Sequence, residues 1–348
     1  MLRGMVLLGI ALLVWLVYLL GWFTPPRRWE TATGWDRIPP AQRAPFFSDF
    51  AAEEDFALDW LGHSGFVLRW AGQTILLDPN TSTRCTVSRR AMELPEDIAR
   101  VVSVDAVLIS HAHYDHLNVD TLKRVPSIGF TAIPAGAEGY LAESAAHTHP
   151  RPVVAHEKIT LGPLEIFPVP AAHNGNRFHP LKSKIPAVGY IIRSPTRTLY
   201  YAGDTSFALD FASIRDRYHP DLAILPIGAY SPRLPLKFHH LNPEEAVQAA
   251  QILGVKTTIP CHFGTFTLSF DRPAAALPRF AAAAHAAGLH WVMPLLAKSG
   301  EVISRQDAKD AKKDGSQRHR GAEPFEFRVS TFPFVPMSLC AFVPSFYD

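Results

Sequence analysis

The sequence has little cysteine and no strong excess of charge of one sign. Its three cysteines, Cys85, Cys261 and Cys340, are far apart and form no CxxC pair. This spacing argues against a disulfide framework and against a thiolate zinc site, so we interpret them as ordinary small residues. The formal net charge is only +2. The chain therefore lacks the basic surface of a nucleic-acid-binding protein, and we expect no nucleic-acid partner.

Charged residues make up only 19% of the 348 residues, whereas hydrophobic residues make up 47%. A chain of this length and composition can bury one sizeable core. No internal repeat is visible. We therefore expect one main domain.

The sequence does contain one long hydrophobic run, residues 4–23, which has no charged residue. As a helix it would span about 28 Å, close to the ~30 Å hydrocarbon core of a bilayer. The alternative is a cleaved signal peptide, but the run exceeds the usual ~7–15 apolar residues and ends in Trp22 and Phe23 instead of small residues. We predict an N-terminal transmembrane helix within residues 1–24, which makes the membrane a partner.

Basic residues flank this run on both sides, Arg3 before it and Arg27, Arg28, Arg37 and Arg43 after it. The larger cluster follows the run, which favours a cytoplasmic catalytic domain. Residues 25–50 are rich in Pro and Arg and indicate a linker or a segment along the domain surface. We expect the domain at 51–304 and a disordered or loosely docked tail at 305–348.

Short runs of β-branched and aromatic residues predict strands at 57–61, 66–70, 74–78, 106–110, 164–169, 187–193, 198–202, 221–227 and 257–260. Two helices are clear. One is capped by Asn242 and ends at Gly254, and an Ala-rich one covers 272–287. This mixed order predicts an α/β protein in which sheets pack together under helices.

The strongest local signal is the motif His111-Ala112-His113-Tyr114-Asp115-His116, directly after an apolar strand. Three imidazoles and one carboxylate on a single short loop offer ligands to two adjacent metal ions. Surface histidines in a turn are the alternative, which is common for one histidine but not for such a cluster.

Further candidate ligands, His173, Asp204 and His262, each follow an apolar strand. Taken singly, either histidine fits an ordinary hydrogen-bonded residue, and Asp204 fits a turn. Their occurrence together favours one metal site.

The HxHxDH motif, His173, the sequence Gly203-Asp204-Thr205 and His262 together resemble the metallo-β-lactamase superfamily, over about residues 59–304. The resemblance implies a four-layer αββα sandwich with a metal site at one edge of its two sheets. It also implies that His111, His113 and His173 hold one divalent ion, that Asp115, His116 and His262 hold the other, and that Asp204 bridges them. Histidine and carboxylate ligands suit zinc, with manganese and iron as alternatives.

Three further stretches, WLGHSGFVLRWAGQTILLDP, HHLNPEEAV and CHFGTF, are similar to the N-acylphosphatidylethanolamine-hydrolysing phospholipase D branch. That resemblance implies that Tyr114 and His240 contact substrate; a packing aromatic and a helix-entry histidine are the alternatives. His63, in the turn Gly62-His63-Ser64-Gly65, is either an ordinary turn histidine, the commoner case, or a partner of a metal ligand.

The function expected from these residues is hydrolysis of a phospholipid phosphodiester by a hydroxide that bridges two metal ions, with Asp115 and His240 as catalytic groups. The same chemistry serves a lactone, amide or soluble phosphoester hydrolase. A membrane-anchored scaffold without activity is a further alternative. The oligomeric state stays open, a homodimer included.

Overall fold

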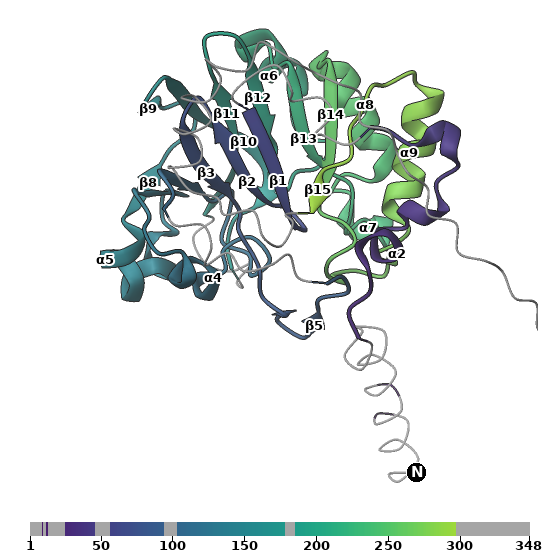
Figure 1. Ribbon diagram of the computed structural model, residues 1–348, viewed down its shortest axis with the longest axis horizontal. Coiled ribbons are helices and arrows are strands. Elements are labelled where there is room, and N and C mark those ends of the chain that lie inside the picture. Colours follow the sequence, from purple (N-terminus) through teal and green to yellow (C-terminus); the bar gives the residue numbers. More distant parts are fainter. Residues whose placement is uncertain are drawn as a thin grey trace, which may run out of the picture. The chain divides into compact units, whose positions relative to one another are not determined.

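Two mixed β-sheets packed face to face form the centre of the domain. The computed structural model describes residues 9, 12, 25–45, 56–93, 103–177 and 185–296. Within these residues, helices cover the outer side of each sheet, so the layers follow the order helix, sheet, sheet, helix (Figure 1). The mixed α/β architecture expected from the sequence is therefore confirmed.

The first sheet has the strand order β15-β1-β2-β3-β6-β7-β8. Its first three strands in the chain form an antiparallel meander, and β6, β7 and β8 continue from β3 in parallel. The bounds are β1 (Phe56–Gly62), β2 (Gly65–Trp70), β3 (Gln73–Leu77), β6 (Ala106–Leu108), β7 (Thr131–Pro134), β8 (Pro150–Val153) and β15 (Leu295–Leu296).

The second sheet has the order β14-β13-β12-β11-β10-β9 and changes from antiparallel to parallel pairing at β12. Its strands are β9 (Ile159–Leu161), β10 (Leu164–Asn174), β11 (Pro186–Arg193), β12 (Thr198–Tyr201), β13 (Leu222–Pro226) and β14 (Thr257–Cys261). A separate hairpin consists of β4 (Arg84–Cys85) and β5 (Ser88–Arg89).

The first sheet is buried on both faces, because its apolar side chains point alternately to one face and the other. In β2, Phe66 and Leu68 belong to the main core, whereas Val67 points to a second cluster that contains Leu122 and Leu141. Successive side chains of a strand point to opposite faces. The second cluster is closed by α4 (Val119–Arg124) and η4 (Glu138–Ser144), and α5 (Ala145–Thr148) contacts α4 through His147 and the Leu122 carbonyl.

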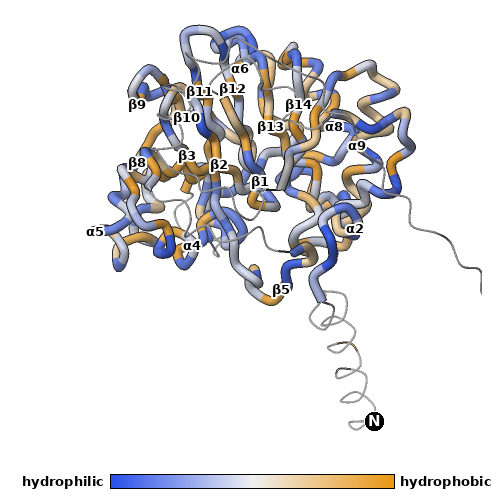
Figure 2. The backbone as a smooth tube through the Cα atoms, in the orientation of Figure 1, coloured by the Kyte–Doolittle hydropathy of each residue, from blue (hydrophilic) through white to orange (hydrophobic). Residues whose placement is uncertain are grey.

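The second sheet is covered by helices, and one of them has start and stop signals that are visible in the sequence. These helices are α6 (Phe211–Tyr218), α8 (Pro243–Leu253) and α9 (Ala276–Ala286). Asn242 and Glu245 form a capping box at the start of α8, and Gly254 ends it in the left-handed conformation (φ 66°). Figure 2 shows hydrophobic residues along the central strands and hydrophilic residues on the outer turns.

The part of the expected linker that the structure describes packs against the domain. It contains α2 (Trp29–Thr33), η1 (Trp35–Arg37) and η2 (Pro40–Gln42). Trp35 and Ile38 belong to the main core, and the Trp35 ring lies edge-on to Trp291 at 6.3 Å. Residues 25–45 therefore lie along the domain and contribute to its core.

None of the helices in the described ranges is both long and apolar enough to cross a bilayer. The predicted anchor, residues 1–24, lies outside these ranges except for positions 9 and 12. The predicted tail, 305–348, and residues 297–304 of the expected domain also lie outside them.

One buried hydrogen bond joins the two sheets directly above the histidine-rich loop. The hydroxyl of Tyr190, on β11, donates to the Ile109 carbonyl after β6, at 2.8 Å. Tyr200, on the neighbouring β12, is also fully buried, but its hydroxyl has no hydrogen-bond partner among the described residues.

This pair of tyrosines gives a matched test of the link between the sheets. Tyr190→Phe should lower the free energy of unfolding by about 1–2 kcal/mol, because it removes a buried hydrogen bond and leaves a carbonyl unsatisfied. Tyr200→Phe should cause no loss, because its hydroxyl is already unpaired. Urea unfolding of both variants checks this expectation, and equal losses would contradict it.

Candidate metal centre

The HxHxDH motif forms a tight loop after β6, where the first sheet meets the second. The amides of His116 and Leu117 both donate to the His113 carbonyl, and the Ala112 amide donates to Gly175. These bonds hold the loop against the end of β10. Its side chains are therefore fixed relative to both sheets.

His111, His113 and His173 bring three imidazole nitrogens together. Nδ1 of His113 lies 2.9 Å from Nε2 of His111 and 3.2 Å from Nε2 of His173. Nitrogens bound tetrahedrally to one zinc at about 2.0–2.1 Å would be about 3.3 Å apart. The geometry fits a common metal ion, as the sequence predicts for these three residues.

Asp115, His116 and His262 form a second group beside the first. Asp115 Oδ2 lies 3.5 Å from His116 Nε2 and 3.4 Å from His262 Nε2. The His116 and His262 rings are nearly parallel, at 22°. This group also has the spacing of ligands around one ion.

Asp204, after β12, lies between the two groups. Its Oδ2 atom is 3.3 Å from His116 Nε2, 3.1 Å from His262 Nε2 and 4.0 Å from His111 Nε2. The preceding Gly203 has a φ of 59°, and a Cβ there would lie 2.6 Å from the Ser110 side chain. Glycine is therefore required at this close approach. The structure thus brings together all seven residues expected as ligands.

Several buried atoms that face this centre have no hydrogen-bond partner among the described residues. They are Asp204 Oδ1, His116 Nε2 and His262 Nε2. A buried polar group without a hydrogen-bond partner lowers the free energy of unfolding by about 1–3 kcal/mol, and by more if it is charged. The cost is explained if these atoms have a cation as their partner.

The electrostatics of the centre also favour a cation. Although burial opposes it, His116 holds the pKa of both Asp115 and Asp204 well below the usual range. Burial lowers the pKa of His173 to about 4 and that of His111 well below its usual value. Buried anions beside neutral imidazoles with free lone pairs match what a divalent ion needs.

Outer hydrogen bonds orient the imidazoles. His116 Nδ1 donates to Asp78 Oδ2 at 2.7 Å, and His173 Nδ1 donates to the His239 carbonyl at 2.8 Å. The Ser110 hydroxyl also bonds Asp78 Oδ2, at 2.5 Å, and lies 2.9 Å from His111 Nδ1. With Nδ1 protonated in this way, the Nε2 lone pairs of His111, His116 and His173 point to the centre.

Asp78 is a functional residue that sequence reasoning did not single out. It is fully buried after β3, and its Oδ2 also accepts from the Tyr201 hydroxyl at 2.6 Å. Its one sequence signal was its position directly after an apolar strand, as for Asp204. However, the sequence Asp78-Pro79-Asn80 is equally typical of a turn.

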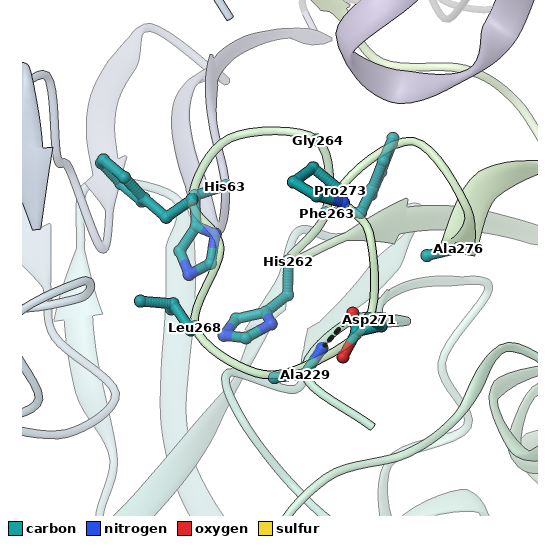
Figure 3. Close-up of a pocket in the computed structure, with 10 residues that line it drawn as sticks. His63, Ala229, His262, Phe263, Gly264, Leu268, Asp271, Pro273 and Ala276 are labelled. Carbon is teal, nitrogen blue, oxygen red and sulfur yellow. Dashed lines mark hydrogen bonds between the residues drawn. The ribbon is translucent and has the colours of Figure 1, made fainter. Parts of the chain in front are cut away.

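The preference for an ordinary turn role for His63 is wrong. His63 is buried, and its Nε2 lies 2.9 Å from Asp115 Oδ2. Figure 3 shows His63 and His262 side by side, with ring centroids 4.0 Å apart, on one wall of a cavity of about 10 Å³. On another wall, Asp271 accepts a hydrogen bond from the Ala229 amide at 3.2 Å (Figure 3). His63 therefore positions Asp115 from outside the centre.

The expected substrate contacts, Tyr114 and His240, line a larger cavity over the metal centre. This cavity has a volume of about 210 Å³ and reaches Asp115, Asp204 and His262. Nδ1 of His240 lies 3.6 Å from Asp204 Oδ2. Arg177, which the sequence analysis did not consider, also lines it and lies 4.4 Å from the Tyr114 ring.

Arg177 combines support of the loop with a position at the cavity. Its guanidinium donates to the carbonyls of Ala112 and Leu117, at 3.0 and 2.8 Å. Both carbonyls belong to the HxHxDH loop. A positive charge therefore lies beside the ligands on the open side of the centre.

Comparisons with known proteins agree with this fold and site. Residues 73–263 match the family model described as the beta-lactamase superfamily domain. An uncharacterized protein of Mycobacterium tuberculosis is 33% identical over 261 residues, which cover 69% of this chain and 68% of the relative. The Caenorhabditis elegans protein named N-acyl-phosphatidylethanolamine-hydrolyzing phospholipase D 1 is 29% identical over 243 residues, which cover 63% and 67%.

A solved structure shows the same fold. It is described as a novel metallo hydrolase from the archaeon Ignicoccus hospitalis, has 24% identity and a TM-score of 0.53, and covers 71% of this chain and 96% of its own. Together with the ligand-like clusters, these matches confirm the resemblance found in the sequence. The chain belongs to the beta-lactamase superfamily and is a metal-dependent hydrolase of that family.

Proposed function

We propose that this hydrolase holds two divalent ions, zinc in the first place, and cleaves the phosphodiester of N-acylphosphatidylethanolamine-like phospholipids. The observation that carries the proposal is the pair of ligand clusters, with Asp204 between them, beneath one open cavity. Histidine nitrogens and carboxylate oxygens suit zinc, and two adjacent ions are a common arrangement for phosphodiester hydrolysis.

The ligand assignment follows the two clusters. His111, His113 and His173 would hold one ion, Asp115, His116 and His262 the other, and Asp204 would contact both. Bound there, the ions would supply an activated water and neutralise charge on the phosphate. The two ions would also supply the positive charge that the two buried carboxylates require.

Three side chains at the cavity would act on the substrate directly. The Arg177 guanidinium would attract the phosphate, and the Tyr114 hydroxyl would donate to one of its oxygens. His240, fixed near Asp204, would pass a proton to the leaving oxygen. Leu236 and Leu268 line the same cavity and suit the apolar part of a lipid.

The name of the Caenorhabditis elegans relative supports the choice of substrate class. We also propose that residues 4–23 anchor the chain in a membrane, with the catalytic domain on the cytoplasmic side. A tethered enzyme meets lipid headgroups without first having to bind the membrane from solution. Phospholipid and membrane are thus the partners in this proposal.

Removal of one cluster should separate the two metal sites. The full-length protein should hold about two zinc ions per chain, and His262→Asn about one, because His111, His113 and His173 remain. Asparagine tolerates the positive φ of 61° at this position. His219→Asn, at a remote histidine with a φ of 48°, is the matched control and should keep both ions. Elemental analysis after gel filtration is the measurement; an unchanged ratio in His262→Asn would contradict the assignment.

Asp78 should affect metal affinity without binding a metal itself. Asp78→Asn should weaken zinc binding by about 10–100-fold, since the amide cannot serve all the donors that now meet the carboxylate. Asp105→Asn is the control, because Asp105 lies at the other end of β6 and accepts from the Thr74 amide. Competition with a chelating dye measures both affinities. Equal affinity of Asp78→Asn and the parent protein would refute this role.

Zinc-loaded protein should convert N-acylphosphatidylethanolamine in mixed vesicles into phosphatidic acid and an N-acylethanolamine, and a chelator should stop the reaction. Mass spectrometry of the lipid extract identifies both products. If the protein instead left all phosphatidylethanolamines intact and hydrolysed lactones, amides or soluble phosphoesters, the phospholipid assignment would be wrong.

His240→Gln should lower kcat on that lipid about 100-fold or more and leave the zinc content unchanged, as expected for loss of a proton donor. His239→Gln is the matched control. The exposed His239 accepts the hydrogen bond of His173 through its backbone carbonyl, which the substitution keeps, and only an edge-on ring contact at 5.9 Å is lost. A similar loss in both variants would count against a catalytic role for His240.

A further inference from the structure

Three segments far apart in the sequence surround the mouth of the larger cavity, and together we name them the cavity rim: residues 84–90, 229–239 and 266–272. Each of them contributes residues that line the cavity, among them Thr86, Leu236 and Leu268. Backbone amides join the segments: Thr267 donates to the Ser88 hydroxyl and Phe270 to the Ser231 carbonyl, both at 2.9 Å. The rim is therefore one continuous surface around the site.

The rim exposes large apolar side chains. Phe270 is 75% exposed, Leu234 65%, Phe238 60% and Val87 53%. Leu268 is also exposed, so half of the ten large hydrophobic residues found exposed in the described part of the chain lie on this small area. An apolar patch concentrated around a site opening marks an interaction surface, whereas scattered apolar residues do not.

The charge of the rim is strongly positive. Its basic residues are Arg84, Arg89, Arg90, Arg233, Lys237 and Arg272, and its one acidic residue is Asp271. The Asp271 carboxylate accepts hydrogen bonds from the backbone amides of residues 229–231. Arg90 is buried and Arg233 is paired with Glu245, yet the outward balance remains basic.

Basic and apolar groups are interleaved on this surface. The Lys237 ammonium lies 4.9 Å from the centre of the exposed Phe238 ring. A side chain that combines an apolar body with a charged end next to an aromatic ring is typical of proteins that lie at a membrane interface. The partner of the rim should therefore be both apolar and negatively charged.

The chain enters the domain beside the rim. Arg27 pairs with Met92: its amide donates to the Ala91 carbonyl at 2.8 Å, and its carbonyl accepts from the Glu93 amide at 2.9 Å. Residues 91–93 directly follow the rim segment 84–90, and β5, α7 (Arg233–Leu236) and the entering segment lie at the same end of the domain (Figure 1). The described segment that begins at residue 25 thus lies at the side of the domain that carries the rim.

We propose that the cavity rim is a docking face for an anionic lipid bilayer. Val87, Leu234, Phe238 and Phe270 enter the boundary between headgroups and acyl chains, while the basic side chains meet lipid phosphates. The cavity mouth then opens onto the bilayer, so a headgroup reaches Arg177 and His240 without leaving the membrane. This inference rests on the proposed lipid substrate and extends it to a defined contact surface.

The test places an environment-sensitive NBD fluorophore at one introduced cysteine of the zinc-loaded, full-length protein. The remaining Cys85 and Cys261 are buried. The labelled variants are Phe270→Cys and Phe238→Cys in a Cys340→Ser background, and Val154→Cys is the matched control. Val154 is also a large exposed apolar residue, 57% exposed, but lies between β8 and β9, outside the rim. Spectra are recorded with vesicles of phosphatidylcholine alone and of phosphatidylcholine with phosphatidylglycerol, the latter also containing a lipid-borne quencher.

On anionic vesicles, the fluorescence emission of the probes at 270 and 238 should shift to the blue and be quenched several-fold. The response should be weaker at high salt. The emission of the probe at 154 should stay that of a probe in water. Spectra at 270 and 238 that match the control would overturn the proposal, and so would a blue shift already present without lipid, which means that protein covers the rim. The readout needs no turnover. Failure of phospholipid hydrolysis alone would therefore refute the proposed function, whereas water-exposed probes refute the docking face.

Discussion

The constraint on which the rest of the site depends is the burial of two carboxylates, Asp115 and Asp204, a few ångströms apart in the interior. Two anions there are tolerated only if positive charge lies between and around them. The histidines alone supply it by protonation of His116 and His262, whose pKa rises against the effect of burial, to about 9 for His262. Divalent ions would supply it by accepting the imidazole lone pairs in place of protons. The contacts of Asp78 and Ser110 serve the same requirement, because they fix which nitrogen of His116 and His111 faces the centre, and His63 positions Asp115.

The fold meets this requirement by bringing strand ends to one edge. The HxHxDH loop follows β6 in the first sheet, while Asp204 and His262 follow β12 and β14 in the second. Parallel strands present their carboxyl ends on the same side, and the helices keep both sheets fixed. Tyr190 ties the two sheets together next to the loop. Ligands from the two sheets are thereby held a few ångströms apart, although they are far apart in the sequence.

Local patterns carried most of what the sequence could predict. The HxHxDH motif concentrates four ligands in six residues, and the cap at Asn242 and the stop at Gly254 are local signals, so the motif and α8 were found directly. Asp78 and His63 were missed or undervalued because their partners lie far along the chain: His63 meets Asp115, 52 residues away. The strands β7 and β8 were missed because both are only four residues long and contain proline, which normally argues against a strand.

The spread of the ligands along the chain also governs when the site comes into existence during synthesis. The first cluster is incomplete until His173 has been made, and the second until His262 has been made. Most of the domain is therefore translated before the full set of ligands exists. Shorter nascent chains contain only some of the histidines and carboxylates. The full set of ligands is thus available only at the final stage of the domain's biogenesis, after β14 has taken its place at the sheet edge.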